Sequence, residues 1–152
     1  MFSYLCCHSD KDILKQVIEP EKMACFSFSG KSFIGIPSNI YDGDTLSVTF
    51  VYNGKIVKYR CRTLGYDSPE MRPPLTRPNR DIEKAKATAS KNRFIELLTK
   101  NPEKTIFITC HEFDKYGRLL VEIWNLVDKD SINSIMVSEG YGNKYDGGTK
   151  EI

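Results

Sequence analysis

Residues 45–64 alternate between apolar and polar side chains in two successive runs, and this pattern restricts the fold more than any other part of the sequence. A period of two is that of a β-strand with one buried face. Asn53-Gly54 joins the two runs and supplies the residues that a type I′ hairpin turn requires. The apolar positions of the first run are Leu46, Val48, Phe50 and Tyr52.

The returning run, residues 55–64, has a polar face that carries positive charges. Its apolar positions are Val57, Tyr59 and Cys61. The polar positions between and after them are Lys58, Arg60 and Arg62. The sequence therefore predicts a hairpin with one face in the core and one cationic face.

Three further segments supply the remaining expected strands. Residues 25–41 predict short strands broken at Ser29-Gly30 and Pro37-Ser38, and residues 105–111 and 119–126 predict a second hairpin. Short, hairpin-connected strands with one long helix fit a small closed barrel better than a doubly wound sheet. We expect an α+β chain, mainly β, that forms a five-stranded OB-fold barrel with two main helices packed on it.

The two main helices are expected at residues 81–100 and 131–139. The first is stopped by Asn101-Pro102, and the second has Gly140 as its C-terminal cap. The residues expected on the buried side of the first helix are Ala87, Ser90, Phe94, Leu97 and Leu98.

With 152 residues the chain has the length of one compact domain. Residues 1–24 are expected to form an N-terminal extension, in which Ser9 caps a short amphipathic helix and Pro20 blocks its continuation. Residues 25–152 are expected to form the barrel domain.

The charges nearly balance, because 22 Lys and Arg residues and 20 Asp and Glu residues leave a formal net charge of +2. This excludes a polycation that binds nucleic acid by bulk charge alone. An odd count of five Cys residues favours a reduced, intracellular and cytoplasmic chain, and two scattered His residues make zinc improbable. No feature implies an obligate protein partner, so a monomer is expected.

The state of each cysteine is predicted from its position in the sequence. Cys25, Cys61 and Cys110 are expected to be packed core thiols. Palmitoylation of Cys6 or Cys7 would be a route to membrane attachment, and it is not favoured over a frayed terminus.

Two acidic motifs flank the first hairpin, Asp42-Gly43-Asp44-Thr45 before it and Asp67-Ser68-Pro69-Glu70 after it. Each alone is explained by turn formation. Because an antiparallel hairpin brings its two ends together, Asp44 and Asp67 are expected to converge. Oxygen ligands without His or thiolate partners favour calcium or magnesium over zinc.

Two arginines accompany these acids. Arg62 lies on the strand that runs into Asp67, and Arg118 follows the Asp114-Lys115-Tyr116-Gly117 turn of the second hairpin. Each arginine alone is explained as a solvated surface residue. Beside a metal-carboxylate site, however, two guanidinium groups suit the charge of a phosphodiester transition state.

In this order and spacing the motifs resemble the staphylococcal nuclease (thermonuclease) family, over about residues 36–145. The resemblance implies an OB-type barrel and a calcium-dependent nuclease that cleaves DNA and RNA to 3′-phosphate ends. It further implies that Asp44 and Asp67 bind Ca²⁺ through their side chains and Ser68 through its main-chain carbonyl oxygen. Glu70 would be the general base that activates the attacking water.

The resemblance also implies roles in binding the nucleic acid. Arg62 and Arg118 would bind the scissile phosphate and stabilise the phosphorane. Lys115, Tyr116 and Tyr145 are candidates for contact with the substrate.

Single-stranded DNA and RNA are the expected partners, and the exposed loop of residues 71–80 is expected to present Arg72, Arg77 and Arg80 to them. The alternative function is a noncatalytic nucleic-acid-binding OB module.

Overall fold

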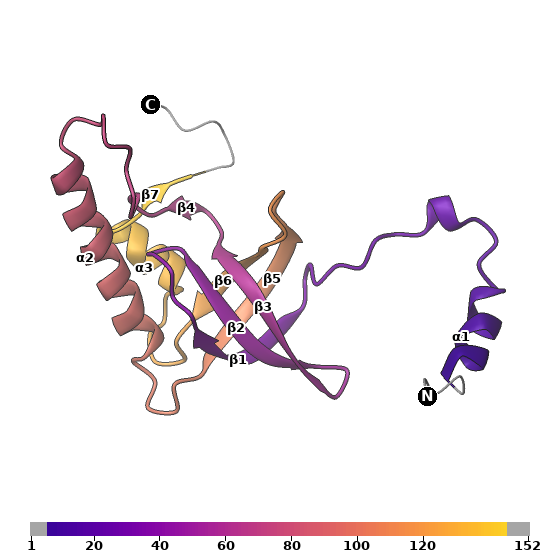
Figure 1. The fold of residues 1–152 in the computed structure, drawn as a ribbon. Helices are drawn as coiled ribbons and strands as arrows, with labels where there is room; N and C mark the ends of the chain where they lie inside the picture. Colours follow the sequence, from indigo (N-terminus) through magenta and orange to yellow (C-terminus); the bar gives the residue numbers. More distant parts are fainter. Residues whose placement is uncertain (1–5, 146–152) are drawn as a thin grey trace, which may run out of the picture.

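Five strands close into a barrel in the order β1-β2-β3-β6-β5 in the computed structural model, which describes residues 6–145 (Figure 1). This confirms the predicted OB-type barrel. The strands are β1 (Ser32–Ser38), β2 (Thr45–Tyr52), β3 (Lys55–Thr63), β5 (Ile106–Phe113) and β6 (Leu119–Trp124).

The β2–β3 hairpin forms as the alternation predicts, with Thr45 opposite Arg62 and Tyr52 opposite Lys55. Asn53 has a φ of 49° and Gly54 a φ of 74°. Two positive φ angles in a two-residue loop are those of a type I′ turn. The turn therefore fixes the register that places Cys61 in the core and Arg62 on the outer face.

Residues 25–41 differ from their prediction of several short strands. They form one strand, β1, which continues through Pro37 instead of breaking there. Pro37 lies beyond Gly35, the last residue of β1 that pairs with β5, so β1 has a single neighbour at this point. A proline is tolerated on such an edge, because no ladder bond to its missing N–H is needed there.

Phe28, which precedes β1, fills one end of the barrel with its side chain. It is 1% exposed, and its ring centroid lies 4.8–6.2 Å from those of six other aromatic rings. Aromatic pairs at such distances stabilise a core beyond the area that they bury. The rings around it are Phe26, Phe33, Phe50, Tyr52, Tyr59 and Phe113.

Parallel pairing of β3 with β6 closes the barrel, with Arg62 opposite Leu120. The β5–β6 turn that precedes β6 is held by Asp114, whose Oδ1 accepts hydrogen bonds from Tyr116 N at 2.8 Å and Arg118 N at 2.9 Å. The closure therefore brings Arg118, just before β6, beside the strand that carries Arg62.

Helices α2 (Arg80–Leu98) and α3 (Ile132–Ser138) lie on one side of the barrel (Figure 1). The buried residues of α2 are those that the sequence predicts. Ser131 caps α3 by accepting a hydrogen bond from Ser134 N. Two short strands, β4 (Tyr66–Asp67) and β7 (Asn143–Lys144), pair beside these helices.

The N-terminal helix α1 (Cys6–Leu14) lies apart from the barrel, and a 3₁₀ turn, η1 (Pro20–Lys22), follows it (Figure 1). The prediction that Ser9 caps this helix is wrong, because α1 already begins at Cys6. None of the helices between residues 6 and 145 is both long and apolar enough to cross a membrane. Palmitoylation of Cys6 or Cys7 stays a prediction, since those side chains lie outside the described part of the chain.

The cysteine expectations hold at two of three positions. Cys61 and Cys110 are buried, and burial raises the pKa of their thiols to about 12 and about 11. Cys25 is exposed, because the chain at this point has not yet entered the barrel.

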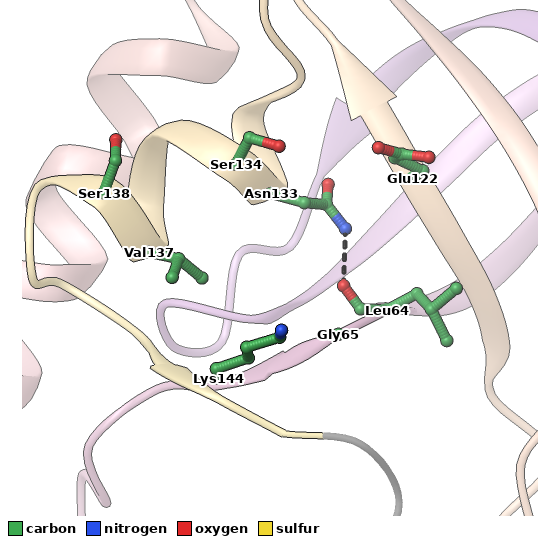
Figure 2. A pocket seen from close by; sticks show the side chains of 8 residues that line it. All are labelled: Leu64, Gly65, Glu122, Asn133, Ser134, Val137, Ser138 and Lys144. Atoms are coloured by element: carbon green, nitrogen blue, oxygen red, sulfur yellow. Dashed lines mark hydrogen bonds between the residues drawn. The ribbon is translucent and has the colours of Figure 1, made fainter.

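Asn133 of α3 ties three segments together. Its Oδ1 accepts a hydrogen bond from Ile123 N at 3.0 Å, and its Nδ2 donates to Leu64 O at 2.9 Å and Val121 O at 3.2 Å. Figure 2 shows the bond to Leu64 at the edge of a groove between α3, β6 and β7. Asn133 thus holds the chain where β3 ends and leads to Asp67.

Asn133→Ala should lower the free energy of unfolding by about 1–3 kcal/mol, because the buried Ile123 N loses this partner, whereas Val121 O keeps the hydrogen bond from Leu64 N. Urea denaturation followed by circular dichroism measures this. Ser138→Ala, at an exposed position of the same helix, is the control and should change stability by less than about 0.5 kcal/mol. Equal effects of the two substitutions would contradict the role of Asn133.

Candidate functional site

A polar cavity of about 290 Å³ lies where the first hairpin, the segment after β4 and the β5–β6 turn meet. Its lining includes every residue predicted to be catalytic or to bind the metal. The residues around it are Tyr41, Asp42, Asp44, Arg62, Asp67, Ser68, Pro69, Glu70 and Arg118.

Asp44 joins the two acidic motifs. Its carboxylate is buried, with Oδ1 accepting hydrogen bonds from Arg62 Nη1 and Thr45 Oγ1, each at 2.9 Å. Oδ2 accepts from Ser68 N at 2.7 Å. The predicted convergence of the two motifs is therefore made by direct contact.

Arg62 bridges the two aspartates. Its Nη1 contacts Asp44, and its Nη2 donates to Asp67 Oδ1. All three side chains are largely buried, so removal of one partner would leave an uncompensated charge. The guanidinium group therefore lies between the carboxylates that were predicted to bind a cation.

Asp42 is a third acid on the same cavity. Burial, and secondly the negative charge of Asp44, raises the pKa of Asp42 to about 6. One of its oxygens accepts a hydrogen bond from Asp44 N at 3.0 Å, which fixes the turn before β2. The cavity thus already concentrates negative charge, a property that favours a cation.

Arg118 is oriented by the turn from which it comes. Its Nε donates to Asp114 Oδ2 at 2.6 Å. Burial acts to raise the pKa of Asp114, but hydrogen bonds from the backbone and side chain of Arg118 and from Tyr116 N outweigh it and lower that pKa. Asp114 therefore stays ionised and holds the guanidinium group at the cavity.

Glu70 lies at the exposed side of the cavity. Its Oε1 accepts a hydrogen bond from Arg72 N at 3.2 Å. Its carboxylate thus meets both the cavity and the solvent, unlike the buried Asp44.

The structure does not place the three predicted substrate contacts on the cavity lining. Tyr116 is 71% exposed, and its ring centroid lies 5.1 Å from Lys115 Nζ and 5.4 Å from Arg118 Cζ. Lys115 and Tyr116 therefore stand beside Arg118 at the rim. Tyr145 donates its backbone N–H to Gly65 O at 3.0 Å, on the side where β7 pairs with β4.

The loop arginines are partly engaged by the protein itself. Arg77 pairs with Glu83 at 2.7 Å, and Arg80 donates to Pro73 O at 3.1 Å. Arg72 is exposed, as the sequence predicts, whereas Pro73 is buried and Arg80 is the first residue of α2 instead of a loop residue.

Tyr41 and Tyr66 belong to the site although no sequence signal singles them out beyond their positions next to the acidic motifs. Tyr41 lines the cavity. Tyr66 is buried, and its hydroxyl donates to Gly43 O at 2.6 Å. This bond ties the loop that carries Asp44 to the residue before Asp67.

Gly43 is required because the structure leaves no room for a side chain at this position. A Cβ atom built at this position would lie 2.1 Å from Ser90 Oγ and 2.9 Å from Ser68 Cβ. Ser90 Oγ is buried and has no hydrogen-bond partner between residues 6 and 145. Helix α2 thus packs directly against the backbone of the acidic loop.

The cavity lining offers oxygen donors, the type that Ca²⁺ takes, although no three His, Cys, Asp or Glu side chains between residues 6 and 145 form a metal-binding group by themselves. Ca²⁺ accepts main-chain carbonyl and water oxygens beside carboxylates. The guanidinium group of Arg62 lies between Asp44 and Asp67 and contacts both carboxylates.

A larger groove of about 490 Å³, the one in Figure 2, is lined by fewer charged side chains. Of the residues drawn there, Glu122 and Lys144 are the charged ones. The acidic cavity is therefore the better candidate for a functional site.

The barrel and the cavity together define an OB-fold protein with a site built from carboxylates and arginines. The family model described as "Staphylococcal nuclease homologue" matches residues 60–151, and the chain belongs to this family. The matched range contains Arg62, Asp67, Glu70 and Arg118, whereas Asp44 precedes it. A comparison with curated proteins found no similar sequence.

Gly43→Ala should lower the free energy of unfolding by about 1–3 kcal/mol, because its methyl group overlaps Ser90 and Ser68. Ser90→Ala alone removes an unpartnered hydroxyl and should cost little. In the double variant the loss should be smaller than in Gly43→Ala, by about 0.5 kcal/mol or more. Thermal and urea denaturation of the four proteins measures the coupling, and strictly additive effects would rule out the contact.

Proposed function

We propose that this protein is a calcium-dependent nuclease that hydrolyses phosphodiester bonds of DNA and RNA to 3′-phosphate ends. The observation that carries the proposal is the single cavity shared by Asp44, Asp67, Glu70, Arg62 and Arg118. Paired carboxylates suit a divalent cation, and paired arginines suit a phosphodiester anion. Membership of the staphylococcal nuclease family supports the same function.

Asp44 and Asp67 would hold the calcium ion through their side chains, and Ser68 would hold it through its main-chain carbonyl oxygen. When bound, the ion would offset phosphate charge and make water more acidic. Ser68 is already fixed relative to Asp44, because its N–H donates to Asp44 Oδ2. The three groups therefore lie on two short segments that direct contacts hold together.

Glu70 is proposed to remove the proton from the attacking water. Its carboxylate borders the cavity and the solvent, so water can reach both the acid and a phosphate. A carboxylate placed in this way is a suitable general base, whereas the carboxylate of Asp44 is buried.

Arg62 and Arg118 are proposed to bind the phosphate oxygens. A guanidinium group has five N–H donors, so the two bonds of Arg62 to the aspartates leave donors for the substrate. Arg118 contacts Asp114 through Nε, and its terminal nitrogens are not used in that bond. Both groups would gain strength as negative charge develops on the phosphorane.

Incubation of the purified protein with single-stranded DNA, duplex DNA and RNA, in Ca²⁺, Mg²⁺ or EGTA, tests the proposal. Cleavage should require Ca²⁺, because an oxygen-only site with flexible geometry suits the larger ion. Single strands should be cleaved fastest, and the products should carry 3′-phosphates. Binding without cleavage in every buffer would instead support a noncatalytic nucleic-acid-binding OB module.

Glu70→Gln should keep single-strand binding and lower turnover by about 10²–10⁴-fold, because the amide keeps the shape but cannot accept the proton. Single-turnover cleavage and equilibrium binding in EGTA measure the two properties. Glu103→Gln, at an exposed position after α2, makes the same chemical change as a control. Unchanged turnover in Glu70→Gln would mean that another group is the base.

A further inference from the structure

The outer face of β3 carries three cations in a row, Lys58, Arg60 and Arg62, and we call this row the β3 stripe. Arg62 lines the acidic cavity, whereas Arg60 and Lys58 are exposed and lead away from it towards the β2–β3 turn. Alternate residues of a strand are about 6.6–6.8 Å apart. The stripe therefore extends from the proposed site in regular steps, a spacing suited to successive phosphates of an extended strand.

Within the described part of the chain, the two exposed cations have no ion-pair partner. Across the ladder, Arg60 is opposite Ser47 and Lys58 is opposite Thr49. Strands β1, β2 and β3 contain no acidic residue. Between residues 6 and 145, neither Lys58 nor Arg60 forms a salt bridge or a side-chain hydrogen bond. Two arginines of the loop at residues 71–80, by contrast, are held by Glu83 and by Pro73 O.

The surface around the stripe is open. Figure 1 shows the β2–β3 hairpin projecting away from α2 and α3. Strand β6 pairs with β3 only at Cys61, Arg62 and Thr63, so the strand does not border the Lys58 end of the stripe. A ligand that follows β3 towards Lys58 would therefore not meet β6, and the strand beside its path would be β2.

Beyond Lys58, the same face ends in a pair of exposed apolar side chains. Ile56 is 79% exposed and Val51, opposite it on β2, is 59% exposed. Apolar surface of this kind suits the face of an unpaired base, which a duplex would keep inside its stack. The hairpin thus offers cations for phosphates and an apolar end for a base.

We infer that the β3 stripe is a binding track for single-stranded nucleic acid that continues the proposed cavity. Arg60 and Lys58 bind the two phosphates next to the one at Arg62, and Ile56 with Val51 contacts an unpaired base. The inference rests on the proposed function for the position of the first phosphate, and it adds the extent and direction of the substrate. Such contacts give affinity without sequence readout.

The test compares the wild-type chain with Lys58→Gln/Arg60→Gln in EGTA. Fluorescence anisotropy measures binding of a labelled single-stranded decanucleotide across a salt series. The slope of log affinity against log salt should become shallower by about 0.7 for each phosphate that is no longer neutralised, or about 1.4 for both. A labelled dinucleotide, which reaches only the cavity, should bind the two proteins equally.

Lys104→Gln/Lys129→Gln removes the same charge from exposed positions in the loops after α2 and after β6, and it should leave the slope unchanged. An equal change of slope in this control would show that the overall charge of the protein, and not the β3 stripe, sets the salt dependence. The binding track would then be wrong. An equal change with a duplex of the same length would overturn the assignment to single strands.

Cleavage by the wild-type chain in Ca²⁺ separates this inference from the proposed function. If the wild type cleaves and the slope of the stripe variant is unchanged, the track is wrong and the proposed function stands. If the wild type never cleaves but the stripe variant has the shallower slope, the track stands as a binding surface and the proposed function fails.

Discussion

Parallel pairing of β3 with β6, over only three residue pairs, is the constraint on which the rest of this structure depends. The two strands come from different hairpins, and nothing local to either one specifies that they meet. Once they do, Arg118 lies beside Arg62, and α3 can reach both strands through Asn133. The cavity therefore depends on the closure of the barrel as well as on the residues that line it.

Local physics explains which parts of the fold could be predicted. The β2–β3 hairpin follows from period-two alternation and one Asn-Gly turn, and α2 from helix formers with a single apolar side. Phe28 could not be predicted as the residue that fills the barrel end, because its ring partners come from four different strands. Likewise, a proline such as Pro37 normally indicates that a strand ends. It is tolerated here because β5 pairs with β1 only as far as Gly35, which the sequence does not reveal.

The candidate site divides in the same way. The approach of Asp44 to Asp67 could be predicted, because one hairpin separates them. The bond from Tyr66 to Gly43 and the contact of Gly43 with Ser90 could not, since they depend on how α2 packs on the barrel. The roles of Lys115, Tyr116 and Tyr145 stay predictions, and of these Lys115 and Tyr116 stand beside Arg118.

The alternation of β3 also limits how this protein can evolve. Its inward side chains fill the barrel while its outward side chains are the row of cations, so the two sets are interleaved one residue apart. Deleting or inserting a single residue in this strand would turn Arg60 or Arg62 into the core and Tyr59 or Cys61 out to water. Single side chains along β3 can therefore be exchanged without shifting their neighbours, whereas a change in the strand's length would alter both faces at once.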